Sequence, residues 1–180
     1  MSIAENILSI RQRIAAAAES CGRDAGEIML VGASKMNDAA ACREAIAAGI
    51  DALGENRVQE MTAKLADDAY RGAPLYFIGH LQRNKVRQVV GKVDLIQSVG
   101  SLPLLQEIEK EAAKQGITQD ILLEVNIGRE EAKSGFLEEE VFAAAAEAKD
   151  CPHVRVKGLM TVPPVEVEAH DCIPYFEKVR

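Results

Sequence analysis

Short apolar runs alternate with helical patterns along the whole chain, and this alternation restricts the fold more than any other feature. Six runs read as strands, at residues 28–35, 50–54, 75–79, 93–98, 121–126 and 154–161. No linker or low-complexity tract interrupts the order. Because strands joined through helices run parallel, the sequence predicts an α/β fold built on a parallel sheet.

Local signals mark several of the helix ends. Ser2 and Glu5 form a capping-box pattern at the start of the first helix. Asp38 can cap an alanine-rich helix that follows the first strand. A later helix opens at Ser101 and closes at Gly116. These signals predict helices between the strands, with further ones near residues 58–69, 85–90 and 137–149.

Two parallel architectures compete for this pattern. A doubly wound sheet would need a glycine-rich phosphate turn after its first strand, and Ala33-Ser34-Lys35-Met36 offers none. A TIM (β/α)8-type barrel instead collects polar residues at the carboxyl ends of its strands. Such residues follow all six strands: Lys35, Glu55 and Asn56, His80, Ser98, Asn126, and Thr161. We therefore expect a barrel with these residues at one mouth.

The length of the chain does not complete such a barrel. Only about six strands can be read in 180 residues, whereas a full barrel takes about 250 residues. We expect residues 1–180 to be a single barrel domain that is incomplete at its C-terminal end, with the last two βα units missing.

Composition excludes several classes of function. A net charge of −7 argues against a protein that coats nucleic acid. No apolar stretch is long enough to span a bilayer, and the N-terminus lacks the order of a secretion signal. We expect a cytoplasmic protein with neither nucleic-acid nor membrane partners.

Lys35 is the residue with the clearest chemistry. It ends the first apolar run, where burial would disfavour its ammonium form and make the amine a nucleophile for an aldehyde. The alternative is a lysine that extends to the edge of the sheet and stays charged.

Two mirror-image pairs of soft ligands are the only hint of a metal. Cys151 and His153 are separated by one residue, as are His170 and Cys172. Zinc ligand pairs usually have wider spacing, so we expect free thiols and no metal.

Five motifs at and near the strand ends resemble one known family. They are Val-Gly-Ala-Ser-Lys at 31–35, Leu-Gly-Glu-Asn-Arg-Val-Gln-Glu at 53–60, Phe-Ile-Gly-His-Leu-Gln-Arg-Asn-Lys at 77–85, Glu-Val-Asn at 124–126 with Lys-Ser-Gly-Phe at 133–136, and Gly-Leu-Met-Thr at 158–161. They resemble the motifs of the pyridoxal-phosphate homeostasis proteins, whose single barrel is similar to the N-terminal domain of alanine racemase.

The resemblance implies a cofactor and residues that bind it. Lys35 would form a covalent aldimine with pyridoxal 5′-phosphate, Asn56 would lie near the cofactor, and Met160 would line its ring. Family members take part in vitamin B6 homeostasis without established turnover and are thought to buffer the cofactor or deliver it to apoenzymes. We expect such a carrier here, as a monomer.

Departures from the family pattern weaken the expected grip on the cofactor. The family's serine-rich loop and Arg-x-Gly turn, which hold the phosphate and face the pyridine nitrogen, have no counterpart in these 180 residues. Gly32 and the run Met36-Asn37-Asp38 also differ from the commoner family sequence. Because several charge-assisted bonds are then absent, we predict weak cofactor retention or none.

Other functions remain as alternatives. An amino-acid racemase of the alanine racemase type needs proton donors on both faces of the substrate, and neither the tyrosines nor His80 offers a convincing second donor. An aldolase would use the lysine without a cofactor, but the motifs do not resemble those families. A partner-binding module built on Arg83, Lys85 and Arg87 lacks interleaved aromatic residues.

Overall fold

The computed structural model describes residues 2–165 and 168–180. The chain forms two compact units, Met1–Tyr76 and Phe77–Arg180. Six strands occur in the described part of the chain, with helices between them, and every strand pair with a known register is parallel. The predicted α/β class is therefore confirmed. The expectation of a single domain stays a prediction.

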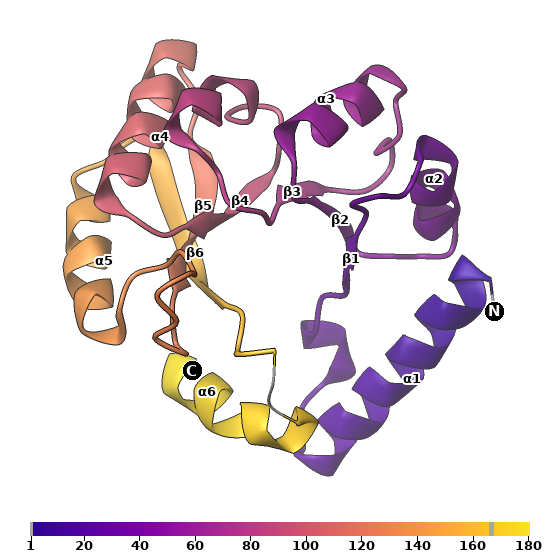
Figure 1. Cartoon of the computed structure of the whole chain (residues 1–180). Coiled ribbons are helices and arrows are strands. Elements are labelled where there is room, and N and C mark those ends of the chain that lie inside the picture. The colour runs from indigo at the N-terminus through magenta and orange to yellow at the C-terminus, as the bar shows by residue number, and fades with distance from the viewer. Residues whose placement is uncertain (1, 166–167) are drawn as a thin grey trace. The chain divides into compact units, whose positions relative to one another are not determined.

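The first unit begins with a long helix and then alternates strands with helices. Its elements are α1 (Ile3–Ser20), the 3₁₀ helix η1 (Ala25–Glu27), β1 (Val31–Ala33), α2 (Ala39–Ala47), β2 (Ala52–Glu55), α3 (Val58–Ala66) and the start of β3 (Leu75–Phe77). β1 and β2 pair in parallel, with Val31 opposite Ala52. Within this unit, α2 and α3 follow their strands on one side, and α1 lies beside α2 (Figure 1).

Side-chain caps fix two of these helix starts as the sequence predicted. Ser2 Oγ accepts from the backbone N–H of Glu5 at 3.2 Å, and Glu5 Oε2 accepts from Ser2 N at 2.7 Å. Asp38 Oδ1 accepts from Ala41 N at 2.8 Å. Each cap satisfies backbone N–H groups that have no partner within the helix. The starts of α1 and α2 are therefore fixed by side chains that lie next to them in the sequence.

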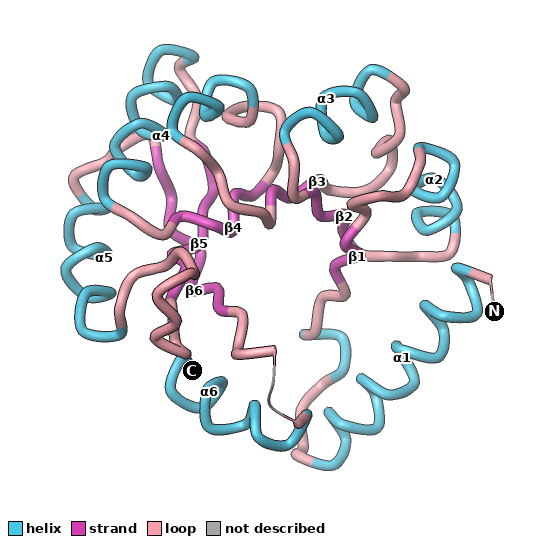
Figure 2. Tube along the Cα trace, viewed as in Figure 1, coloured by secondary structure: helices cyan, strands magenta, loops and turns pink. Residues whose placement is uncertain are grey.

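The second unit holds three parallel strands with helices between them. Its elements after β3 are η2 (Arg83–Gln88), β4 (Leu95–Val99), α4 (Leu102–Gln115), β5 (Gln119–Val125), η3 (Glu138–Glu140), α5 (Val141–Lys149), β6 (Val154–Thr161), η4 (Ala169–Cys172) and α6 (Ile173–Val179). β5 pairs with both β4 and β6. Figure 2 shows α4 and α5 on one side of these strands, with loops at their ends.

Two predicted helices differ from those observed in this unit. The segment expected to be helical near 85–90 is the 3₁₀ helix η2, and the segment 137–149 opens with the 3₁₀ turn η3 before α5. No side chain caps the start of η2, and Gly91 follows it with φ 75°. A 3₁₀ helix suits so short a connection, because its hydrogen bonds join residues only three apart and form in segments of a few residues.

Burial in β5 shows how the strands of the second unit meet their core. Ile121, Leu123 and Val125 are buried, whereas the residues between them are half-buried. Inward side chains therefore alternate along the strand, as they must in a pleated sheet. Among the described helices, none combines the length and apolar character needed to cross a bilayer.

Candidate functional site

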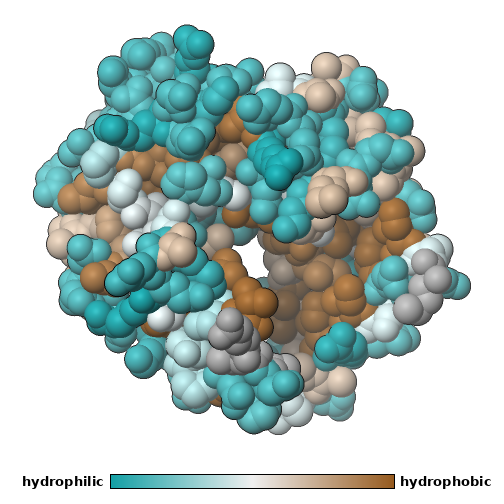
Figure 3. Space-filling model, in the orientation of Figure 1, coloured by the Kyte–Doolittle hydropathy of each residue, from teal (hydrophilic) through white to brown (hydrophobic). Residues whose placement is uncertain are grey.

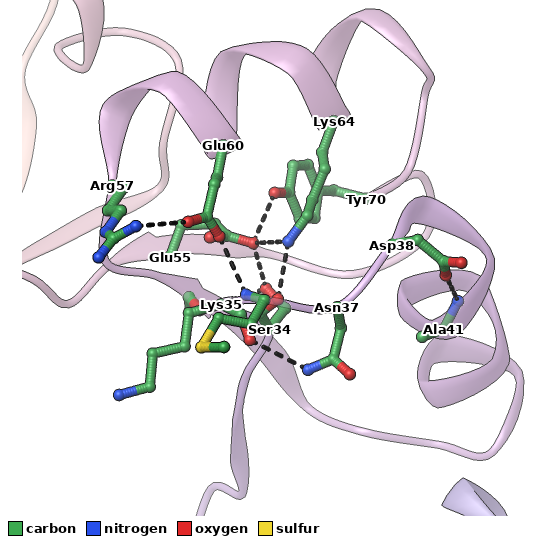
Figure 4. Close-up of polar contacts among 12 residues, drawn as sticks. Ser34, Lys35, Asn37, Asp38, Ala41, Glu55, Arg57, Glu60, Lys64 and Tyr70 are labelled. Carbon is green, nitrogen blue, oxygen red and sulfur yellow. Dashed lines mark hydrogen bonds and ion pairs between the residues drawn. The ribbon is translucent and has the colours of Figure 1, made fainter.

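Lys35 lies just beyond β1, in the turn that leads to α2. Ser34 before it is buried, whereas Lys35 itself is exposed. The Lys35 ammonium makes no hydrogen bond or ion pair with any residue in 2–165 or 168–180. Figure 4 shows its side chain pointing away from the polar cluster next to it. The expected desolvation of Lys35 is therefore wrong for this structure, because β1 ends at Ala33 and Lys35 lies in the exposed turn that follows.

A buried ion pair lies directly behind this turn. Lys64 Nζ, on α3, donates to Glu55 Oε1 at 2.6 Å and to the carbonyl oxygen of Ser34 at 2.7 Å. Ser34 Oγ donates to the same Glu55 oxygen at 2.6 Å, and Tyr70 Oη donates to it at 3.0 Å. Glu55 is fully buried, and the side chain of Lys64 is 9% exposed. The pair thus connects the end of β2 and α3 to the peptide bond that precedes Lys35 (Figure 4).

The peptide bond after Lys35 is held as well. Met36 N donates to Glu60 Oε2 at 3.0 Å, and Asn37 Nδ2 donates to the carbonyl oxygen of Lys35 at 3.1 Å. Met36 has φ 63°, in the left-handed region that residues other than glycine seldom adopt. The hydrogen bond that Met36 N donates to Glu60 helps to hold this unusual turn.

Burial shifts the ionisation of two groups beside the ion pair. It raises the pKa of the Tyr70 hydroxyl far above its usual value, and the negative charge of Glu55 adds to the effect. Burial also raises the pKa of the Cys42 thiol, with Lys64 acting in the opposite direction. Both groups are therefore neutral at physiological pH, so Tyr70 remains a donor to Glu55.

The other two predicted cofactor residues lie in different units. Asn56 follows β2 and is half-buried, and its Oδ1 is buried without a hydrogen-bond partner among the described residues. Met160 is half-buried on β6, in the second unit. A shared site for Lys35, Asn56 and Met160 stays a prediction.

Three strand-end residues that were expected at an open mouth are instead bonded to the backbone of the second unit. Ser98 is buried and donates to the carbonyl oxygen of Gly79. Asn126 Nδ2 donates to the carbonyl oxygen of Glu130 at 2.9 Å, and Thr161 Oγ1 donates to that of Val125 at 2.9 Å. These side chains stabilise the strand ends.

A pocket of about 470 Å³ occupies the same end of the second unit. It is lined in part by His80, Arg83, Ser101 and Ser134. His80 Nδ1 lies 2.7 Å from Ser134 Oγ. In the described residues, no group of three or more His, Cys, Asp or Glu side chains could hold a metal ion.

The first unit has a more apolar hollow of about 320 Å³ between α1 and β1. Its lining includes Ile3, Ile7, Ile10 and Leu30, and Figure 3 shows apolar surface where α1 faces β1. Lys35 does not line it. This hollow therefore lacks the amine that the predicted chemistry requires.

Comparison with known proteins identifies the family. The model of the alanine racemase N-terminal domain family matches residues 3–177. The pyridoxal phosphate homeostasis protein of Aquifex aeolicus (strain VF5) is 41% identical over 182 residues, which cover 100% of this chain and 79% of that protein. The chain belongs to the pyridoxal phosphate homeostasis protein family. Its counterpart in Pseudomonas aeruginosa is 36% identical, with 99% of this chain and 78% of that protein covered.

Solved structures similar to this chain confirm the barrel-type fold. An unknown protein from Bifidobacterium adolescentis is 35% identical with a TM-score of 0.91, covering 99% of this chain and 76% of that chain. PipY of Synechococcus elongatus PCC7942, with PLP bound, is 29% identical with a TM-score of 0.83, covering 99% of this chain and 79% of that chain. An alanine racemase of Clostridium difficile 630 is 16% identical with a TM-score of 0.71, covering 84% and 42%, and shows the fold alone.

Sequence reasoning missed the roles of Lys64, Tyr70 and Glu60. One signal was available for Lys64: it follows Val58 and Met61 at three-residue spacing and so falls on the buried face of α3. A lysine on such a face needs a partner. Nothing local to Tyr70 or Glu60 indicates their partners, which come from β2 and from the turn after β1.

Proposed function

We propose that this chain binds pyridoxal 5′-phosphate covalently through Lys35 and takes part in the homeostasis of that cofactor. The observation that carries the proposal is the exposed amine of Lys35, which has no partner among the described residues and stands on a turn held from both sides. Condensation of a primary amine with an aldehyde gives an imine and releases one water. The names of the relatives and the PLP-bound state of PipY support the choice of aldehyde.

The residues present fit the aldehyde end of the cofactor. The reaction needs an amine that is accessible and that no hydrogen bond or ion pair holds, and among the described residues Lys35 meets both conditions. When bound, the cofactor supplies an electron sink, while the protein provides orientation and electrostatics. Asn56 and Met160 are its further proposed binding residues, on the strength of the family motifs.

We propose binding without turnover, with apoenzymes that use the cofactor as recipients. A racemase needs a second proton donor opposite the lysine, and the family motifs assign none. The likeness to alanine racemase concerns the fold alone. A cytoplasmic, monomeric protein is proposed; its four cysteines are free, as suits a reducing compartment.

Trapping with borohydride tests the proposal. The chain is mixed with pyridoxal 5′-phosphate, reduced and digested, and the modified lysine is located by mass spectrometry. We expect the label on Lys35 and its loss from that position in Lys35→Ala. Lys92→Ala, which removes an exposed lysine from the second unit, is the matched control and should label as the natural chain does. Label spread evenly over the lysines, or none at all, contradicts the proposal.

Turnover is tested separately. Exchange of the α-proton of alanine in deuterated water should stay at the level of free pyridoxal 5′-phosphate. Exchange that rises with protein concentration and is lost in Lys35→Ala would show a racemase instead.

A further inference from the structure

The side chains of α3 hold both peptide bonds that flank Lys35. Lys64 Nζ donates to the carbonyl oxygen before the lysine at 2.7 Å, and Glu60 Oε2 accepts from the N–H after it at 3.0 Å. Both residues lie on one short helix, Val58–Ala66, one turn apart. The main chain around Lys35 thus has two anchors on a single rigid element.

The anchor at Lys64 is itself fixed. Its ammonium is bonded to Glu55 at 2.6 Å, and the same carboxylate oxygen accepts from Tyr70 and Ser34. Glu55 lies at the end of β2, which pairs with β1, the strand that precedes the lysine turn. Because the ion pair is almost fully buried, water does not compete for its hydrogen bonds, and the two side chains keep one arrangement.

The anchor at Glu60 acts on a strained residue. Met36 adopts φ 63° although the residue is 89% exposed and gains little from packing. A residue in this region costs about 1 kcal/mol or more, so the conformation persists only where its surroundings hold it. The bond from Met36 N to Glu60 is one such restraint.

We propose that Lys64 and Glu60 are positioning residues for Lys35, which fix its main chain so that the free amine is presented in one direction. The proposal rests on the assignment of Lys35 as the cofactor-binding lysine. Neither residue makes a hydrogen bond or ion pair with the amine, so each acts on the direction in which the amine points.

The experiment compares two reactions of Lys35 in the same proteins. The first is labelling by pyridoxal 5′-phosphate with borohydride, which depends on the direction of the amine. The second is acylation by acetic anhydride, a small reagent that reports only whether the amine is accessible and unprotonated. Both rates are measured at Lys35 by peptide mass spectrometry.

Four single variants test the anchor at Glu60. Glu60→Ala should slow cofactor labelling of Lys35 about tenfold while acylation stays unchanged. Glu60→Gln keeps an oxygen acceptor for Met36 N and should restore the natural rate. Glu107→Ala and Lys110→Met, which break an exposed ion pair on α4, are the matched controls and should change neither rate.

Removal of Lys64 alone would leave Glu55 buried without its ion-pair partner, so Glu55 is changed as well. Lys64→Met combined with Glu55→Gln leaves no buried charge and should slow cofactor labelling as Glu60→Ala does. Amide hydrogen exchange at Met36 gives a readout without cofactor and should accelerate in Glu60→Ala only.

Three results would overturn the proposal. They are natural cofactor labelling rates in both Glu60→Ala and the double variant, an equal fall of labelling and acylation, or unchanged exchange at Met36. Failure of the natural chain to label Lys35 at all would instead refute the proposed function, and the positioning role with it.

Discussion

Loss of the Lys64 ammonium should destabilise the protein far more than loss of a surface charge. Lys64→Met removes the ion-pair partner of Glu55, a carboxylate with no exposed surface. Breaking a buried pair by removing one partner costs about 3–5 kcal/mol. Since Ser34 and Tyr70 still donate to Glu55, the lower end, about 3 kcal/mol, is expected. For a chain of this length, that loss lowers the melting temperature by about 6–12 °C.

Equilibrium unfolding in guanidinium chloride, followed by circular dichroism, measures this free energy. Lys110→Met removes an exposed lysine that pairs with Glu107 at 3.7 Å and should cost less than about 1 kcal/mol. The double variant Lys64→Met with Glu55→Gln should recover most of the loss, because no buried charge then lacks a partner.

Two results would refute this reasoning. One is a Lys64→Met variant that is as stable as Lys110→Met. The other is a double variant whose loss equals the sum of the two single losses, because additivity would mean that Lys64 and Glu55 do not interact.

The remaining predictions concern three local features. Burial raises the pKa of Glu124, so ionisation of this carboxyl costs stability at neutral pH, and the cost fades as the pH falls to the ordinary value of 4.5. In urea titrations, Glu124→Gln should therefore raise the free energy of unfolding by about 1 kcal/mol at pH 7 and leave it unchanged in acid. The hydrogen bond from Arg11 lowers the pKa of Asp51, so the ionised carboxylate stabilises the fold at pH values above its ordinary pKa of 3.8, and this stabilisation is lost in more acidic solution. Asp51→Asn should lower the free energy of unfolding by about 1 kcal/mol at pH 7, and acid titrations should show that the loss shrinks as the pH falls. Gly135 has φ 119°, and a Cβ there would lie 2.6 Å from a backbone nitrogen, whereas Gly116 has φ 65° and open space around it. In thermal melts, Gly116→Ala should lose about 1 kcal/mol of stability and Gly135→Ala at least about 2 kcal/mol. Equal losses would contradict the steric argument.

The order of elements could be predicted because its signals are local. Ser2, Asp38 and Gly116 mark helix ends through bonds or dihedral angles that involve only neighbouring residues. Alternating apolar runs placed all six strands. Each signal acts over a few residues, so the sequence alone carries it.

The surroundings of Lys35 could not be predicted, because they depend on residues from other elements. The apolar run 28–35 suggested a strand that reaches the lysine, yet β1 ends at Ala33 and Lys35 is exposed. Glu55 was expected to face an open mouth, yet Lys64 of α3 makes its burial tolerable. Such pairing depends on how α3 packs against β2, which no local pattern encodes.

The segment that follows β5 has a consequence for any ligand of the second unit. Asn126 bonds to the backbone of Glu130, Phe136 N donates to the carbonyl oxygen of Glu124 at 2.8 Å, and Arg129 pairs with Glu139 at 2.6 Å. A stretch that looks like a free surface loop in the sequence is thereby fastened to the end of β5. Binding of a ligand against this segment would cost little entropy, because the segment is already ordered. The ligand would therefore have to fit a shape that exists before it binds.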